Sequence, residues 1–254
     1  EVTFIKNKGP VLSNFNINNF LNNNPETFIK RLNPIYEAIK KTRKKLNKSK
    51  SLISFVGAPW TLIVYMLGLK SNENSLNFSK IKNLNFDIKI VLNKLIDYLC
   101  IHIKNQLMAG SDIVQVFDSW AGLLPIKELN TYCYEPNLKI VEFCKKKKTP
   151  IICFPKGIKE KYLEFQNIVK PDGLNLDYDI NPEWAKQNLT KVVLQGGMHP
   201  QFLLKSVEEM NGEAKKYLDT FRDVPYIFNL GHGIVPETSP GQVEELIKFI
   251  RNFK

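Results

Sequence analysis

Three side chains that can exchange a proton or donate a hydrogen bond each follow a short apolar run. Tyr65 lies in "FVGAPWTLIVYML", Ser119 in "VFDSWAG" and His232 in "NLGHG". His232 stands between Gly231 and Gly233, and glycines let other groups approach the backbone closely. Residues of these types at strand ends are typical of α/β enzymes. Together they predict a cofactor-free site that binds a polar ligand and manages protons.

Each of these side chains, taken alone, has an ordinary structural alternative. Tyr65 is equally typical of a core tyrosine, Ser119 of a helix cap and His232 of a hydrogen-bonded structural histidine. Their shared position after apolar runs favours a common pocket over three separate structural roles.

Other chemistries find no support in the motifs. The sequence contains no phosphate-binding loop, no GxGxxG turn and no GxSxG nucleophile elbow. Metal ligands at useful spacing are absent, and Lys156 is the only lysine in a context that suits a Schiff base. The four cysteines show no CxxC spacing, so we expect reduced and mostly buried thiols of an intracellular protein.

The chain has 254 residues and a formal charge of +11. Nucleic acid or an acidic ligand would explain this charge, but "KKKK" (145–148) and "NFNINNFLNNN" (14–24) favour a coding bias towards lysine and asparagine. Because aromatic residues do not interleave with the basic runs, we expect no nucleic-acid partner. The apolar runs are too short to span a membrane, and no signal peptide is recognisable. The first residue is Glu1, so we expect a piece of a longer protein.

Six apolar runs alternate with stretches of helical periodicity. The runs fall at 52–56, 113–117, 151–154, 173–176, 191–194 and 226–230. This alternation predicts an α/β domain, residues 1–254, with a parallel sheet covered by helices. Six strand–helix units are two short of a closed (β/α)8 barrel, so either the sheet is open or two units lie upstream.

Several local features are also readable. Residues 1–25 are polar and are expected to form a loop or arm. A helix is expected to begin near Pro25, with a kink at Pro34, and another to span 201–221. For the last helix, Ser239 is the expected cap and Gln242 the residue that completes a capping box.

The ordered motifs resemble one known family. "FVGAPWTLIVYM", "GSDIVQVFDSWAG", "FPKG", "GLNLDY", "QGGMHP" and "YIFNLGHGIVPETSP" together are similar to uroporphyrinogen decarboxylases over nearly the whole chain. The resemblance implies a (β/α)8 TIM-type barrel, with about six of its eight units in this chain, and a homodimer without metal or organic cofactor. It also implies conversion of uroporphyrinogen III to coproporphyrinogen III by four acetate decarboxylations, in the cytoplasm or a plastid.

The resemblance also carries residue roles. The family's substrate-contacting tyrosine, serine and histidine correspond to Tyr65, Ser119 and His232, of which Tyr65 and His232 are the candidates for a catalytic role. Phe55 and Phe117 correspond to apolar residues that line the family's cleft.

Two departures from the family pattern bear on function. This chain has "QGGMHP" where the family usually has "QGNLDP", so the loop around Met198 and His199 is altered. The family's N-terminal arginine block is absent, as is the strand with the aspartate that gathers the pyrrole NH groups. An upstream segment that carries these partners would support the enzyme, and a protein without them would support a non-catalytic scaffold.

Three alternatives remain beside the decarboxylase. The first is a non-catalytic porphyrinogen-binding scaffold, which the absent partners and the altered loop favour. The second is a methyltransferase of the same fold, which would need a His-x-Cys pair, and no cysteine stands two residues after any histidine here. The third is a nucleic-acid-binding protein, whose affinity would fall steeply with salt.

Overall fold

A parallel sheet with its strands in chain order is the centre of the molecule. The computed structural model describes residues 2–5, 9–12, 15–72 and 75–253. Within these ranges the largest sheet has six strands in the order β10-β9-β8-β7-β6-β3, and each pairs in parallel with its neighbour. The strands are β3 (Ile53–Gly57), β6 (Ile113–Asp118), β7 (Ile151–Pro155), β8 (Gly173–Leu176), β9 (Val193–Gly196) and β10 (Tyr226–Ile227).

The predicted α/β architecture and all six predicted strands are confirmed. Because each strand lies beside the next one in the chain, the sheet has no point where the strand order reverses. This order is that of a (β/α)8 barrel rather than of a doubly wound sheet. As expected for six units, β3 and β10 end the sheet on either side within the described residues.

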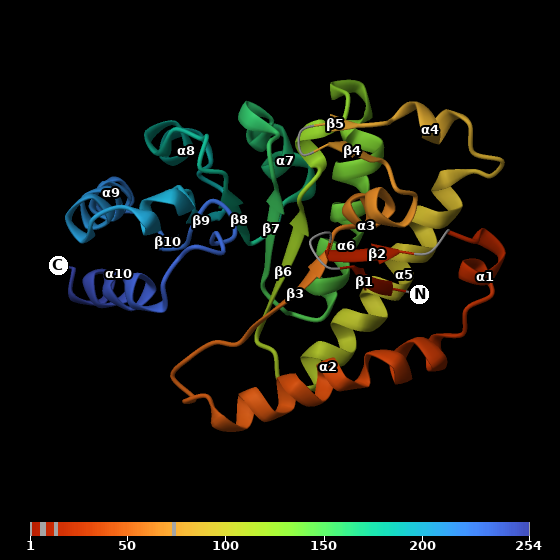
Figure 1. Ribbon diagram of the computed structural model, residues 1–254, viewed down its shortest axis with the longest axis horizontal. Helices are drawn as coiled ribbons and strands as arrows, with labels where there is room; N and C mark the ends of the chain where they lie inside the picture. The colour runs from red at the N-terminus through yellow and green to blue at the C-terminus, as the bar shows by residue number, and fades with distance from the viewer. Residues whose placement is uncertain (1, 6–8, 13–14, 73–74, 254) are drawn as a thin grey trace.

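Helices cover one face of the sheet. In β3, Ser54 and Val56 are buried whereas Ile53 and Phe55 are exposed, which is the alternation of a strand packed on one side only. Contacts join α3 to β6, α5 to β3 and α6 to β7, and Figure 1 shows α2 outside α5. The α-helices around this sheet are α2 (Pro25–Lys45), α3 (Pro59–Met66), α5 (Ile88–Met108), α6 (Glu135–Lys146), α7 (Tyr162–Val169), α8 (Pro182–Asn188), α9 (Val207–Thr220) and α10 (Pro240–Asn252).

Shorter elements connect the main ones. Two small antiparallel pairs form, β1 (Val2–Ile5) with β2 (Gly9–Leu12) and β4 (Lys70–Asn72) with β5 (Ser75–Leu76). The remaining short helices and turns are α1 (Ile17–Leu21), α4 (Ser79–Lys82), η1 (Ala121–Leu123), η2 (Ile126–Glu128), the π-helical turn η3 (Asn130–Tyr134), η4 (Lys159–Lys161) and η5 (Pro200–Leu204).

The prediction of a loop or arm for residues 1–25 is wrong. The β1–β2 hairpin and α1 lie in this segment, except for residues 1, 6–8 and 13–14, which are outside the described ones. The short helix α1, with the sequence INNFL, is capped at its start because the Asn16 side chain accepts a hydrogen bond from the Asn19 amide. Asparagine is read as a loop residue in a sequence, yet it is also a favourable helix cap.

The prediction of one helix over 201–221 is also wrong. Lys205 is extended, so η5 ends there and α9 begins after Ser206. Ser206 and Glu209 exchange hydrogen bonds as a capping box. At α10, Ser239 caps the helix as predicted, but the Gln242 side chain donates to the Lys205 carbonyl at 2.7 Å instead of completing a box.

The other local predictions are confirmed in part. The helix predicted near Pro25 is α2, which begins there and contains Pro34 within its length. The lysines of "KKKK" are exposed. All four cysteines are free thiols, and Cys133, Cys144 and Cys153 are buried. Across the described ranges, no helix is long and apolar enough to cross a membrane.

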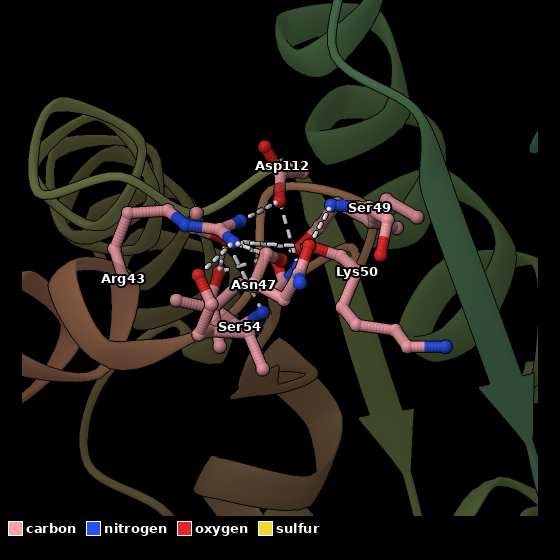
Figure 2. A network of polar contacts seen from close by, with 10 residues as sticks. Arg43, Asn47, Ser49, Lys50, Ser54 and Asp112 are labelled. Carbon is pink, nitrogen blue, oxygen red and sulfur yellow. Dashed lines mark hydrogen bonds and ion pairs between the residues drawn. The ribbon is translucent and has the colours of Figure 1, made fainter.

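Arg43 fastens α2 to the sheet at the amino ends of the strands. Its guanidinium donates to Asp112 at 2.7 Å, and also to the carbonyls of Leu46, Asn47 and Lys50 (Figure 2). The same Asp112 oxygen accepts from the Leu52 amide at 2.7 Å. The Arg43 guanidinium therefore holds the connection from α2 to β3 in place. This connection lies at the end of the sheet opposite to the candidate site.

Candidate functional site

An aromatic row lies on the face of the sheet that the helices do not cover. The ring centroids of Phe55 and Phe117 are 5.8 Å apart, and those of Phe117 and Phe154 are 6.2 Å apart. The row forms because Phe117 is in register with Phe154 on the neighbouring strand, and Phe55 on β3 precedes Gly57, which pairs with Phe117. Phe55 has 65% of its surface exposed. This face therefore offers an apolar surface to a ligand.

Buried amides support the same sheet face. The Gln195 side-chain NH2 donates to Gln115 at 3.2 Å and to Asn175 at 2.7 Å. Asn175 and Gln195 are direct cross-strand partners, and all three side chains are buried. Hydrogen-bonded amides of this kind fix the spacing of β6, β8 and β9 without placing a charge in the interior.

Tyr65 and Ser119 lie at the carboxyl ends of β3 and β6. Tyr65 projects from α3 and is 49% exposed, with its ring 6.0 Å from that of Trp120. Ser119 is half-buried in the turn that follows β6. The Trp60 indole donates to the Trp120 carbonyl at 3.1 Å and so fixes this turn to α3. The two predicted substrate-contacting residues are therefore brought to the same part of the rim.

Asp118 points away from the rim although it adjoins Ser119. Its carboxylate accepts from the Thr61 hydroxyl at 2.9 Å and from the Asn137 amide at 3.1 Å, both on the helix side of the sheet. Burial raises the pKa of Asp118 to about 6, although these hydrogen bonds act to lower it. Asp118 fastens the strand end to α3 and α6, because alternate residues of a strand face opposite sides.

Close glycine contacts join the ends of β6 and β7. The Lys156 amide donates to the Asp118 carbonyl at 3.1 Å, and the Gly122 amide donates to the Lys156 carbonyl at 2.8 Å. A Cβ on Gly122 would overlap the backbone of Gly157, which itself has a φ of +81°. Both positions therefore require glycine.

Asp177 continues this connection to β8. One oxygen of its carboxylate accepts from the Gly157 amide at 2.6 Å and from the Tyr162 hydroxyl at 3.0 Å. Its other oxygen is buried without a partner among the described residues. Burial raises the pKa of Asp177 to about 6, and the nearby Lys156 ammonium acts in the opposite direction.

His232 lies in an exposed bend after β10. Partial desolvation of its ring lowers the pKa of His232, and the nearby Lys156 and His199 side chains act in the same direction. The Gly231 amide donates to the Met198 carbonyl at 2.8 Å, and a Cβ on Gly231 would overlap the backbone of Tyr178. Glycine is therefore needed at 231 so that the loop with His232 can rest on the ends of β8 and β9.

The predicted site residues thus occupy a continuous rim. Tyr65 and Ser119 meet beside Trp120, and His232 lies close enough to Lys156 for the lysine charge to act on its imidazole. Phe55 and Phe117 lie below them on the uncovered sheet face. The strand ends indicated Tyr65, Ser119 and His232, whereas Phe55 and Phe117 were expected from the family resemblance.

Other residues of the rim were not predicted. Phe154 could have been found, because it occupies the same place at the end of its strand as Phe117. Asp177 could not, since its contact with Gly157 joins two distant segments. In the described ranges, His, Cys, Asp and Glu side chains do not gather in groups of three that could hold a metal ion.

Two solved structures show what fold this chain shares with known proteins. A methyltransferase from Methanosarcina mazei superposes with a TM-score of 0.79 at 19% identity, covering 100% of this chain and 75% of that one. A B12-independent methionine synthase from Shewanella sp. W3-18-1 gives a TM-score of 0.61 at 14% identity, covering 85% of this chain and 64% of that one. At these identities the likeness concerns the fold alone, and with the strand order it identifies six units of a (β/α)8 barrel.

Sequence relatives carry a different name. A uroporphyrinogen decarboxylase from Orientia tsutsugamushi (strain Boryong) is 40% identical over 228 residues, covering 88% of this chain and 66% of the relative. One from Rickettsia bellii (strain RML369-C) is 38% identical over 257 residues, covering 100% of this chain and 76% of the relative. The chain thus spans about two thirds of the length of the Orientia protein. The model of the family described as uroporphyrinogen decarboxylase (URO-D) matches residues 1–253. This chain therefore belongs to the uroporphyrinogen decarboxylase family.

Proposed function

We propose that the protein containing this chain decarboxylates the four acetate side chains of uroporphyrinogen III and releases coproporphyrinogen III, a reaction of haem biosynthesis. Family membership over residues 1–253 carries this proposal. The position of Tyr65, Ser119 and His232 along one rim supports it. Because the chain is shorter than its relatives, the activity is proposed for the complete protein.

For each acetate, the reaction needs an electron sink and two protonation steps, one at the pyrrole ring and one at the methylene carbon. Protonation of a pyrrole ring makes a cation, and the bond between the methylene and the carboxylate then breaks. Its electron pair flows into the ring and CO2 leaves. The methylene takes up a proton while the ring loses one, so a carboxylate and one proton become a methyl group and CO2. Groups that hold the substrate and stabilise the ring cation lower this barrier.

The described residues suit the binding part of this task. In the aromatic row, Phe55 and the half-buried Phe117 give the macrocycle an apolar surface, and the buried Phe154 packs against Phe117. Tyr65 and Ser119 supply hydroxyl donors at the rim. His232 has a lowered pKa, so at neutral pH its imidazole is uncharged and offers one donor and one acceptor.

The proposal is tested with the complete protein and uroporphyrinogen III, by separating the oxidised porphyrin products chromatographically. Turnover by the His232→Asn variant should be slower than that of the wild type by about tenfold or more, because a hydrogen bond to the substrate is lost. Its melting temperature should stay unchanged, because His232 is exposed.

A matched control is His102→Asn. His102 is half-buried in α5, where its ring nitrogens contact the Tyr36 hydroxyl at 3.0 Å and the Gln106 amide at 3.1 Å. This variant should lower the melting temperature and leave turnover per folded molecule unchanged. A His232→Asn enzyme with wild-type turnover would remove His232 from the mechanism. A wild-type protein that binds uroporphyrinogen without releasing CO2 would instead be a non-catalytic scaffold.

Two further expectations rest on the family resemblance. We propose a homodimer, which sedimentation of the complete protein would test. We also propose the cytoplasm or a plastid as its compartment, which localisation of the tagged complete protein would test.

A further inference from the structure

Lys156 occupies the middle of the rim and is held there by its backbone. Its amide donates to the carbonyls of Asp118 at 3.1 Å and Phe154 at 3.0 Å, and its carbonyl accepts from Gly122 at 2.8 Å. The backbone amide of the next residue, Gly157, donates a hydrogen bond to the Asp177 carboxylate. The start of the Lys156 side chain is therefore fixed between the turn with Ser119 and the end of β8.

The positive charge of Lys156 has no directly bonded partner within the described part of the chain. Its side chain is half-buried, and its ammonium forms no hydrogen bond or ion pair there. It is close enough to His232 and to Asp177 to shift the titration of both groups. Lys161, by contrast, pairs with Glu164 at 2.9 Å. An ammonium held beside a binding rim without a partner is available to an anionic ligand.

His199 adds a hydrogen-bond donor near His232. The His199 Nδ1 atom accepts a hydrogen bond from the Gln201 amide at 3.1 Å, so the ring proton is on Nε2. The ring packs against Tyr178, with centroids 4.1 Å apart, which restricts its orientation. His199 is half-buried and lies near enough to His232 to influence its charge.

We propose that Lys156 and His199, together with His232, hold one carboxylate arm of the substrate. We call these three residues the carboxylate rim. This inference rests on the proposed function and adds specificity residues to it. The ammonium supplies the charge, and the imidazoles supply neutral N–H donors. Because Asp177 already offsets part of the lysine charge, the carboxylate rim suits a single carboxylate.

The test uses the complete enzyme and the Lys156→Gln variant. Removing a charge-assisted hydrogen bond should raise the KM for uroporphyrinogen about tenfold or more, while kcat changes less than about twofold. Lys156→Arg should restore most of the lost affinity, because it keeps the charge. Lys41→Gln removes the same charge from an exposed position on the outer helix α2 and should leave KM unchanged.

A binding measurement separates this inference from the proposed function. Uroporphyrin, the oxidised and fluorescent form with the same eight carboxylates, is titrated against each variant. The Kd should rise for Lys156→Gln and for His199→Phe, and less for His199→Gln, which keeps an N–H donor. The rise should shrink at high salt, because screening weakens the lysine contribution in the wild type.

The results of these measurements distinguish failure of the carboxylate rim from failure of the proposed function. Active wild-type enzyme with the same KM and Kd in Lys156→Gln would overturn the carboxylate rim and leave the proposed function standing. A reduced kcat that Lys156→Arg does not rescue, with KM unchanged, would overturn it as well. Wild-type protein that neither binds uroporphyrin nor releases CO2 would remove the proposed function, and the inference with it.

Discussion

Asp118 at the end of β6 and Asp177 after the end of β8 are buried aspartates that bond to different parts of the molecule. Asp118 points to the helix layer and bonds Thr61 and Asn137, whereas Asp177 bonds the Gly157 amide in the rim. Burial raises both pKa values from 3.8 to about 6. The folded protein therefore binds protons more tightly at these carboxyls than the unfolded chain does.

This shift predicts how stability depends on pH. Because the folded pKa lies above the unfolded one, the stabilising contribution of Asp118 is complete below about pH 4 and is lost as pH rises through about 6. The loss is on the order of 3 kcal/mol in the free energy of unfolding. Urea unfolding of the wild type and Asp118→Asn between pH 4 and pH 7 measures it. The difference between the two proteins should vary across this window, and parallel curves would contradict the shift.

At the scale of elements, α9 and α10 begin with related but unequal caps. Ser206 and Glu209 bond reciprocally at the start of α9. Ser239 accepts from the Gln242 amide at the start of α10, but the Gln242 side chain bonds Lys205 instead. One helix start is therefore satisfied by two bonds within the cap, and the other by one.

The two caps predict a difference in stability. Ser206→Ala should lower the free energy of unfolding by roughly 1–2 kcal/mol, and Ser239→Ala by roughly 0.5–1 kcal/mol. The first variant also frees the Glu209 carboxylate, whose pKa is lowered chiefly by its hydrogen bond with the Ser206 side chain. Urea unfolding of both variants compares the two effects. A larger loss for Ser239→Ala would show that the reciprocal bond adds nothing.

At the scale of the whole molecule, the sheet has two end strands within the described residues. β3 and β10 each lack a neighbour on one side. Phe55 is 65% exposed beside one end, and Ile227 is 38% exposed at the other. An unpaired strand with exposed apolar side chains pairs readily with another chain.

Residues 1–254 produced by themselves should therefore associate as concentration rises. Ile227→Lys should reduce this association, because a charge on an end strand opposes pairing. Ile247→Lys is the control, since Ile247 is 41% exposed but lies on α10. Light scattering over a concentration series measures the effect. Equal scattering by both variants and the wild type would mean that the strand ends do not drive association. Decarboxylase activity is expected only from the complete protein.

The sequence alone determined the positions of the six strands and their alternation with helices. Strands such as Ile151–Pro155 and Gly173–Leu176 are wholly buried, and a largely apolar run in the sequence predicts such burial. The same reasoning located Tyr65, Ser119 and His232, because parallel strands bring their carboxyl ends to one rim. The β1–β2 hairpin was missed although its strands, VTFI and GPVL, are largely apolar. The break at Lys205 was missed because Ser206, which caps α9, lies within a stretch of helical periodicity.

Only the tertiary structure decided how the rim is held together. Gly157 meets Asp177 across 20 residues, and Gly231 rests on Tyr178 across more than 50. Such contacts depend on strand register and on close backbone approach, which no local pattern records. The same holds for the direction of Asp118, which one residue of strand alternation turns away from Ser119 and into the helix layer. The sequence determines the residue types at the strand ends, and packing determines which of them face a ligand.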